Sequence, residues 1–142
     1  MVLTVLTAAA TAAACTAVRW FLERSSRRPT EHLGGRVRVE ALYNSGAAFG
    51  GRRLRGRGLL AASAAALVLA LGMGRRRGSA LGTGLVLGGG GSNLLERAGR
   101  GRVFDYVRFP RAPGRWRRYV FNLADLAIFL GAALMLARRK KR

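Results

Sequence analysis

Four long apolar blocks constrain the fold of this chain more than any other feature of its sequence. Met1 to Val18, Gly58 to Gly74 and Gly78 to Leu95 carry no charged residue, and Tyr119 to Ala137 carries only Asp125. A helix that spans a bilayer needs about 17 to 25 mostly apolar residues, and each block reaches the lower limit. The sequence therefore predicts an all-α membrane protein with one integral-membrane domain over residues 1–142. We expect its four transmembrane helices at about residues 1–22, 58–74, 78–96 and 119–137.

The positive charge of the chain lies between these blocks. Lysine and arginine number 26 against 6 acidic residues, which gives a net charge of +20. Arginines beside membrane spans meet anionic lipid head groups, so membrane lipids are expected partners. Basic runs also occur in nucleic-acid-binding proteins, but apolar blocks of this length cannot be left in water. We therefore expect no nucleic-acid partner.

The charge pattern leaves the orientation in the membrane open. Cytoplasmic loops usually carry the excess of lysine and arginine. This rule puts the basic tail and the turn at residues 75–77 in the cytoplasm, together with the N-terminus. The other two loops, residues 19–57 and 97–118, are richer still in arginine, which argues against that arrangement.

Two residues that often carry chemistry receive no catalytic role from their context. Cys15 is the single cysteine, so the chain forms no internal disulfide. A buried membrane thiol is favoured over a lipoprotein cleavage site, because no basic segment precedes it. His32 is the single histidine and has no cysteine or acidic neighbour at metal-ligand spacing. We expect no metal and no cofactor.

The third block contains the glycine-rich run "LGTGLVLGGGGSN". It does not satisfy the dinucleotide-binding pattern G-x-G-x-x-G, because Leu87 stands at the third glycine position, and the chain has no Gly-Lys pair for a phosphate loop. Small residues on one helix face instead allow membrane helices to approach closely. Gly82 and residues 88–91 predict such a face.

The two aspartates of the chain are candidate functional residues. Asp125 lies in "FNLADLAIF", about 9 Å into the last block from Tyr119 at the rise of an α-helix. Asn122, three residues earlier, shares its helix face. An ionisable group inside an apolar span is a functional candidate. Asp105 lies in "GRVFDYVRF", where we expect the membrane boundary. The alternative for each aspartate is an ion pair with one of the arginines.

Two boundary aspartates suggest peptide hydrolysis. Carboxyl groups a few ångströms apart share one proton, so one member can activate water while the other polarises a carbonyl. An intramembrane aspartic peptidase is therefore one hypothesis from the residues alone. A small transporter or channel subunit, with Asp125 as a proton or cation site, is another.

Three segments resemble one known family in the same order. "YNSGAAFG", "GGGGSNLLERAGRGRVFDY" and "FNLADLAIFLGAALML" are similar to motifs of the lipoprotein signal peptidases, the signal peptidase II family. The resemblance implies that Asp105 and Asp125 are the catalytic pair. It implies substrate-binding or supporting roles for Asn44, Gly46, Asn93, Arg97 and Asn122.

The same resemblance implies the reaction and the setting. The family removes signal peptides from diacylglyceryl-modified prolipoproteins, cleaving before the lipidated cysteine, and it needs no metal. It implies lipidated prolipoproteins as partners and a multi-pass protein of the bacterial plasma (inner) membrane with both termini cytoplasmic, and we expect a monomer. The alternating run Arg36 to Asn44 would form part of a small extracytoplasmic β-sheet that cradles the substrate. A catalytically inactive homologue that binds lipidated peptides is the alternative.

The chain departs from the family pattern at three places. Glu96 stands where the family usually has Asp, and we expect Glu96 to be a partner of Arg97. Ser92 stands where a glycine usually precedes the asparagine. The first helix lacks the family's Asp and has Arg19 near the position of a Lys.

Overall fold

The computed structural model describes residues 1–25, 28–45, 56–77 and 79–137. Gly46, one of the expected site residues, lies outside the described residues. The long helices and one short 3₁₀ helix are α1 (Val2–Ser25), α2 (Gly56–Arg77), α3 (Ala80–Arg100), η2 (Trp116–Arg118) and α4 (Leu123–Ala137).

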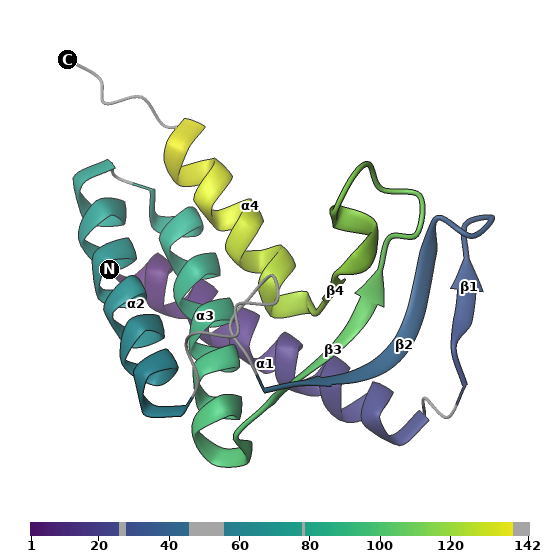
Figure 1. Cartoon of the computed structure of the whole chain (residues 1–142). Coiled ribbons are helices and arrows are strands. Elements are labelled where there is room, and N and C mark those ends of the chain that lie inside the picture. Colours follow the sequence, from purple (N-terminus) through teal and green to yellow (C-terminus); the bar gives the residue numbers. More distant parts are fainter. Residues whose placement is uncertain (26–27, 46–55, 78, 138–142) are drawn as a thin grey trace.

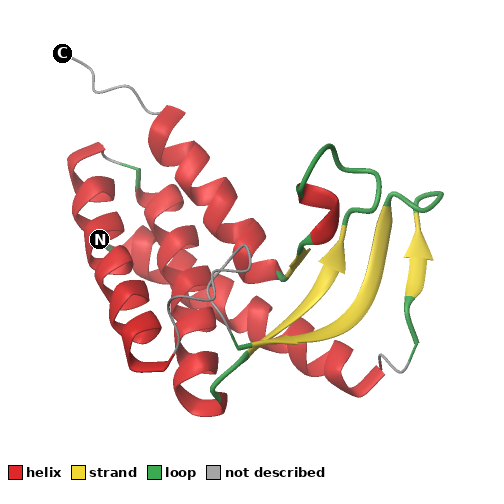
Figure 2. Cartoon of the chain, in the orientation of Figure 1, coloured by secondary structure: helices red, strands yellow, loops and turns green. Residues whose placement is uncertain are grey.

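A small antiparallel sheet accompanies the helices (Figure 2). Its order is β1-β2-β3-β4, and the strands are β1 (Thr30–His32), β2 (Val37–Asn44), β3 (Val103–Arg108) and β4 (Val120–Phe121). The strand predicted from Arg36 to Asn44 is confirmed as β2. Its pairing with β3 shifts register between Val39 and Leu42, so its side chains do not alternate strictly between buried and exposed.

The helix α3 is the centre of the molecule and packs against α1, α2 and α4. Figure 1 shows the sheet at one end of the helices, whereas α1 begins and α4 ends at the other end. α3 ends at Arg100 and is capped by Gly101, whose φ is 69° and whose N–H bonds to the carbonyl oxygen of Arg97. This left-handed cap, which glycine adopts without a Cβ clash, turns the chain directly into β3.

The small-residue face predicted for the third block is confirmed at the helix contacts. A Cβ atom on Gly89 would lie 2.6 Å from the carbonyl oxygen of Ala124 on α4. A Cβ atom on Gly88 would lie 2.5 Å from the carbonyl oxygen of Ala8 on α1. Gly91 is an exception, because a Cβ there would meet nothing within 4 Å. Close backbone approach therefore fixes α3 against both neighbours.

Within the described residues, two helices are long and apolar enough to cross a membrane. They are α1 and residues 56–76 of α2. α4 is apolar but shorter, with 15 residues, and the glycine-rich α3 does not qualify. Apolar side chains face outward on these helices, and Leu69 on α2 is 68% exposed. The fold is that of a mostly helical membrane protein with a small sheet, and two of the four expected spans meet this test.

The start of the fourth expected span is corrected. Residues 119–122 are not helical, because Val120 and Phe121 form β4 and pair with β3, and α4 begins only at Leu123. The apolar character of this stretch reflects its burial as a strand of the sheet, in which Val120 is 9% and Phe121 is 6% exposed.

Candidate active site

The N-terminus of α4 holds Asp125 in a fixed position. The Oδ1 atom of Asn122 accepts a hydrogen bond of 2.9 Å from the backbone N–H of Asp125. In return, Oδ2 of Asp125 accepts one of 3.1 Å from the backbone N–H of Asn122. This is the reciprocal pattern of a capping box, with Asn and Asp in place of the usual Ser or Thr and Glu or Gln. Asp125 therefore lies in the first turn of α4, not several residues inside a helix that begins at Tyr119.

One face of α3 brings polar side chains to the same place. Asn93 and Arg97 follow Gly89 at intervals of four residues, so all three lie on one side of the helix. Because α3 and α4 touch at Gly89, Asn93 comes opposite the start of α4. Its Nδ2 donates to Oδ1 of Asp125 at 3.0 Å, and its Oδ1 accepts from Nδ2 of Asn122 at 3.1 Å.

The sheet supplies the second aspartate. Asp105 lies in β3, and Asn44 is at the end of the neighbouring β2. The Nδ2 atom of Asn44 donates to Oδ2 of Asp105 at 3.1 Å, and Nδ2 of Asn122 donates to Oδ1 of Asp105 at 2.8 Å. The side chain of Asn122 thus contacts Asp105 directly and holds the main chain of Asp125. Asp105 and Asn122 are both 4% exposed.

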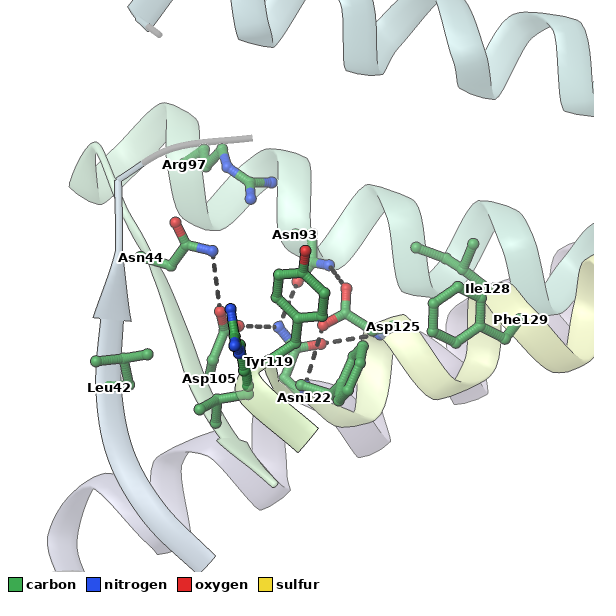
Figure 3. A pocket seen from close by; sticks show the side chains of 13 residues that line it. Leu42, Asn44, Asn93, Arg97, Asp105, Tyr119, Asn122, Asp125, Ile128 and Phe129 are labelled. Carbon is green, nitrogen blue, oxygen red and sulfur yellow. Dashed lines mark hydrogen bonds between the residues drawn. The ribbon is translucent and has the colours of Figure 1, made fainter. Parts of the chain in front are cut away.

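These side chains line one pocket with a volume of about 390 Å³ (Figure 3). All the described residues expected at the site from sequence are found there: Asn44, Asn93, Arg97, Asp105, Asn122 and Asp125. The remaining wall is largely apolar, with Leu42, Ile128 and Phe129 among its residues. A second, mostly apolar groove of about 400 Å³ runs between α2, α3 and α4. It shares Asn93, Arg97 and Asp125 with the first pocket.

The position of Asp105 changes its acidity. Burial, which is the largest cause, and the nearby charge of Asp125 together raise the pKa of its carboxyl group from 3.8 to about 7. The hydrogen bonds from Asn44 and Asn122, and the charge of Arg97, oppose this rise. Asp105 can therefore either hold or release a proton near neutral pH, as general acid–base chemistry requires.

Two side chains make contacts beside Asp105 that the sequence did not predict. The carboxylate of Glu96 accepts a hydrogen bond of 3.1 Å from the backbone N–H of Phe104. The hydroxyl oxygen of Tyr106 accepts one of 2.9 Å from the backbone N–H of Leu123, the first residue of α4. A tyrosine beside an aspartate in an apolar strand carries no sequence signal for such a contact.

The partner expected for Glu96 is corrected. Its ion pair in the described structure is with Arg19 on α1, with an N–O distance of 3.5 Å. Successive helix residues point in directions about 100° apart, so Glu96 faces α1 while Arg97 faces the pocket. Arg19 and Glu96, the positions at which the resemblance implies a Lys and an Asp in the family, are thus in contact with each other.

Comparison with known proteins identifies a matching family and related chains. Residues 4–139 match the family described as signal peptidase (SPase) II. A lipoprotein signal peptidase of Serratia marcescens is 33% identical over 139 residues, covering 89% of this chain and 78% of that protein. One from Symbiobacterium thermophilum is 32% identical over 114 residues, covering 74% of this chain and 71% of that protein.

Two further matches differ in how much of the matched protein they cover. A lipoprotein signal peptidase of Methylorubrum extorquens is 43% identical over 76 residues, and the match spans only 43% of that protein's length. A solved structure described as a bacterial membrane enzyme shares the fold with a TM-score of 0.73 at 15% identity, covering 98% of this chain and 92% of that one. The matched range, and the two relatives that are at least 32% identical and covered over 71% or more of their length, together establish that the chain belongs to the signal peptidase II family of lipoprotein signal peptidases.

Proposed function

We propose that the protein is an intramembrane aspartic endopeptidase that removes signal peptides from diacylglyceryl-modified prolipoproteins by cleaving before the lipidated cysteine. The observation that carries this proposal is the meeting of Asp105 and Asp125 in one pocket, joined through Asn122. Relatives named lipoprotein signal peptidase support the substrate class.

In the proposed mechanism, the two carboxyl groups hold one proton between them. We assign this proton to Asp105, because its pKa of about 7 allows it to be protonated at neutral pH. The ionised Asp125 takes a proton from a water molecule as the water oxygen attacks the scissile carbonyl carbon. Asp105 gives its proton to the carbonyl oxygen. Collapse of the resulting diol breaks the C–N bond as the leaving nitrogen takes the proton that Asp125 now holds, and Asp105 takes back a proton from a diol hydroxyl.

The surrounding residues have proposed supporting roles. Asn93 and Asn122 keep the carboxyl groups oriented through the hydrogen bonds described above. Arg97 lines the pocket and offsets negative charge near the dyad. Asn44 contacts the substrate backbone from the end of β2.

The proposed setting is the bacterial plasma membrane, which a monomer crosses four times as a single domain over residues 1–142. Both termini are then cytoplasmic, and the sheet is extracytoplasmic. The location of the sheet at the end opposite the start of α1 and the end of α4 supports this orientation (Figure 1). The apolar groove between α2, α3 and α4 supports a substrate with acyl chains, because Asp125 lines this groove as well as the first pocket. A cysteine introduced beside Pro29 should react with an impermeant thiol reagent added outside the cell.

The test is turnover of a lipidated prolipoprotein by the purified protein in detergent, read as the mass of the released signal peptide. Cleavage immediately before the modified cysteine supports the proposal. Binding of the substrate without cleavage would instead identify an inactive homologue. Because the chain belongs to the signal peptidase II family, the hypothesis of a transporter subunit is set aside.

A further inference from the structure

Arg118 is a charged residue of the pocket that the proposed mechanism does not use. It ends the short helix η2 (Trp116–Arg118), lies in the pocket lining and is exposed. The other arginine of the lining, Arg97, comes from α3. Arg118 comes from the segment between β3 and β4, so it stands on a different wall of the same pocket.

The backbone that carries Arg118 is well anchored. The N–H of Arg118 bonds to the carbonyl oxygen of Arg115 at 3.0 Å, and Val120, two residues later, pairs with Arg108 in the sheet. The ring of Trp116 stacks on Phe121 with centroids 6.1 Å apart and meets Phe129 of α4 edge-on at 6.3 Å. These contacts fix the turn against α4, and Phe121 and Phe129 themselves line the pocket.

The charge of Arg118 is not neutralised by an acidic side chain of the described residues. Glu23, Glu40 and Glu96 form ion pairs with Arg19, Arg38, Arg100 and Arg108. The acids outside these pairs are the two aspartates of the site and Glu31, which lies on β1 at the far edge of the sheet. With one proton shared by the two aspartates, the two arginines leave the pocket with net positive charge. A pocket of this kind favours a negatively charged group near the reacting carboxyl pair.

We propose that Arg118 forms a carboxylate subsite that favours substrates with Asp or Glu among the first residues after the lipidated cysteine. This inference rests on the proposed function. The segment before the cleavage point of a signal peptide is apolar with small residues at its end, and a carboxylate within the bilayer is costly. The residues after the cysteine are therefore the ones that can bring a carboxylate to the pocket. A guanidinium can bind it through two parallel hydrogen bonds.

The test compares three diacylglyceryl prolipoprotein peptides that differ only in Asp, Asn or Lys at the second position after the cysteine. The full chain is assayed in phosphatidylcholine nanodiscs, which carry no net lipid charge. We expect the wild type to cleave the Asp peptide about tenfold better than the Lys peptide in kcat/KM, in keeping with one charge-assisted contact. Arg118→Gln should reduce this ratio to about twofold, and Arg118→Glu should reverse the preference.

Arg117→Gln is the matched control, because Arg117 is adjacent and exposed but is not part of the pocket lining. It should keep the wild-type preference. An unchanged ratio in Arg118→Gln, or an equal loss of preference in Arg117→Gln, overturns the subsite. An equal loss of rate on all three peptides in Arg118→Gln also overturns it, since it would indicate a role that does not read the substrate's charge. Cleavage without any preference by the wild type contradicts the subsite alone, whereas no cleavage of any peptide contradicts the proposed function as well.

Discussion

Glu96 on α3 and Arg19 on α1 form an ion pair of 3.5 Å in which the Glu96 side chain is only 7% exposed. The same carboxylate oxygen accepts the N–H of Phe104, the residue before Asp105. The pair therefore connects the first helix to the strand that presents a proposed catalytic carboxyl group. A buried acid that loses its partner is costly, and so is a buried N–H without an acceptor.

Removing Glu96 should lower turnover more than substrate binding. We expect Glu96→Ala to reduce kcat by about 10- to 100-fold with little change in KM, because Asp105 moves relative to Asp125. Glu96→Gln keeps an acceptor for the Phe104 N–H but leaves Arg19 unpaired, so its loss should be smaller. Combining Glu96→Gln with Arg19→Met should then restore part of the activity. Strictly multiplicative effects in this double mutant would show that the two residues act independently.

Asn122 performs two tasks that substitution can separate. Asn122→Ser keeps an oxygen that can cap α4 but loses the N–H donor to Asp105, whereas Asn122→Ala loses both. We expect the serine variant to keep the wild-type melting temperature and the alanine variant to lose about 1 kcal/mol of stability. Both should lose at least tenfold in turnover. A fully active serine variant would show that the bond to Asp105 is dispensable.

The acidity of Asp105 predicts a loss of activity in alkaline solution. Its pKa is about 7 because of burial and the charge of Asp125, so the proton that it donates is lost as the pH rises above that value. The rate should fall about tenfold per pH unit well above this pKa. Asn44→Ala removes a hydrogen bond that opposes the rise in pKa, so the alkaline limb should move to higher pH. If the rate of Asn44→Ala falls at the same alkaline pH as that of the wild type, a group other than Asp105 controls the fall.

The same shift predicts how stability depends on pH. The unfolded chain loses the proton of Asp105 near its ordinary pKa of 3.8, whereas the folded protein keeps it up to about 7. Between these values the folded state binds more protons, so this contribution to stability decreases as the pH rises. Asp105→Asn should therefore make the melting temperature, measured in detergent, depend less on pH between pH 4 and 7. An equally steep profile in the variant would assign the dependence to other groups.

A substitution at the contact between α3 and α4 can test whether helix packing positions the side chains of the site. Gly89→Ala would place a Cβ atom 2.6 Å from the carbonyl oxygen of Ala124, so the helices must separate and Asn93 must move away from Asp125. We expect a loss of turnover of about 100-fold, as for a displacement of about 1 Å at a reacting group. Gly91→Ala is the control, because nothing lies within 4 Å of its Cβ position, and it should remain active.

The sequence alone was sufficient to identify the membrane class, α1, α2, the strand β2 and the two aspartates that line one pocket, because these features depend on local composition and on short motifs. It misplaced the start of α4, because residues 119–122 are as apolar as a helix but pair with the sheet. It also predicted Arg97 as the partner of Glu96, whereas Glu96 pairs with Arg19. The partner depends on which face of α3 meets α1, and the sequence does not show this. The contact of Tyr106 with Leu123 depends wholly on tertiary structure.

The central claim is that Asp105 and Asp125 act as one catalytic unit. The most direct measurement is the cleavage rate of a lipidated prolipoprotein by Asp105→Asn, Asp125→Asn and the double variant, with substrate binding measured in parallel. We predict that each single variant abolishes cleavage while binding persists, and that the double variant is little worse than either, since residues of one unit are not additive. Near-normal turnover in either single variant would contradict the assignment of the pair.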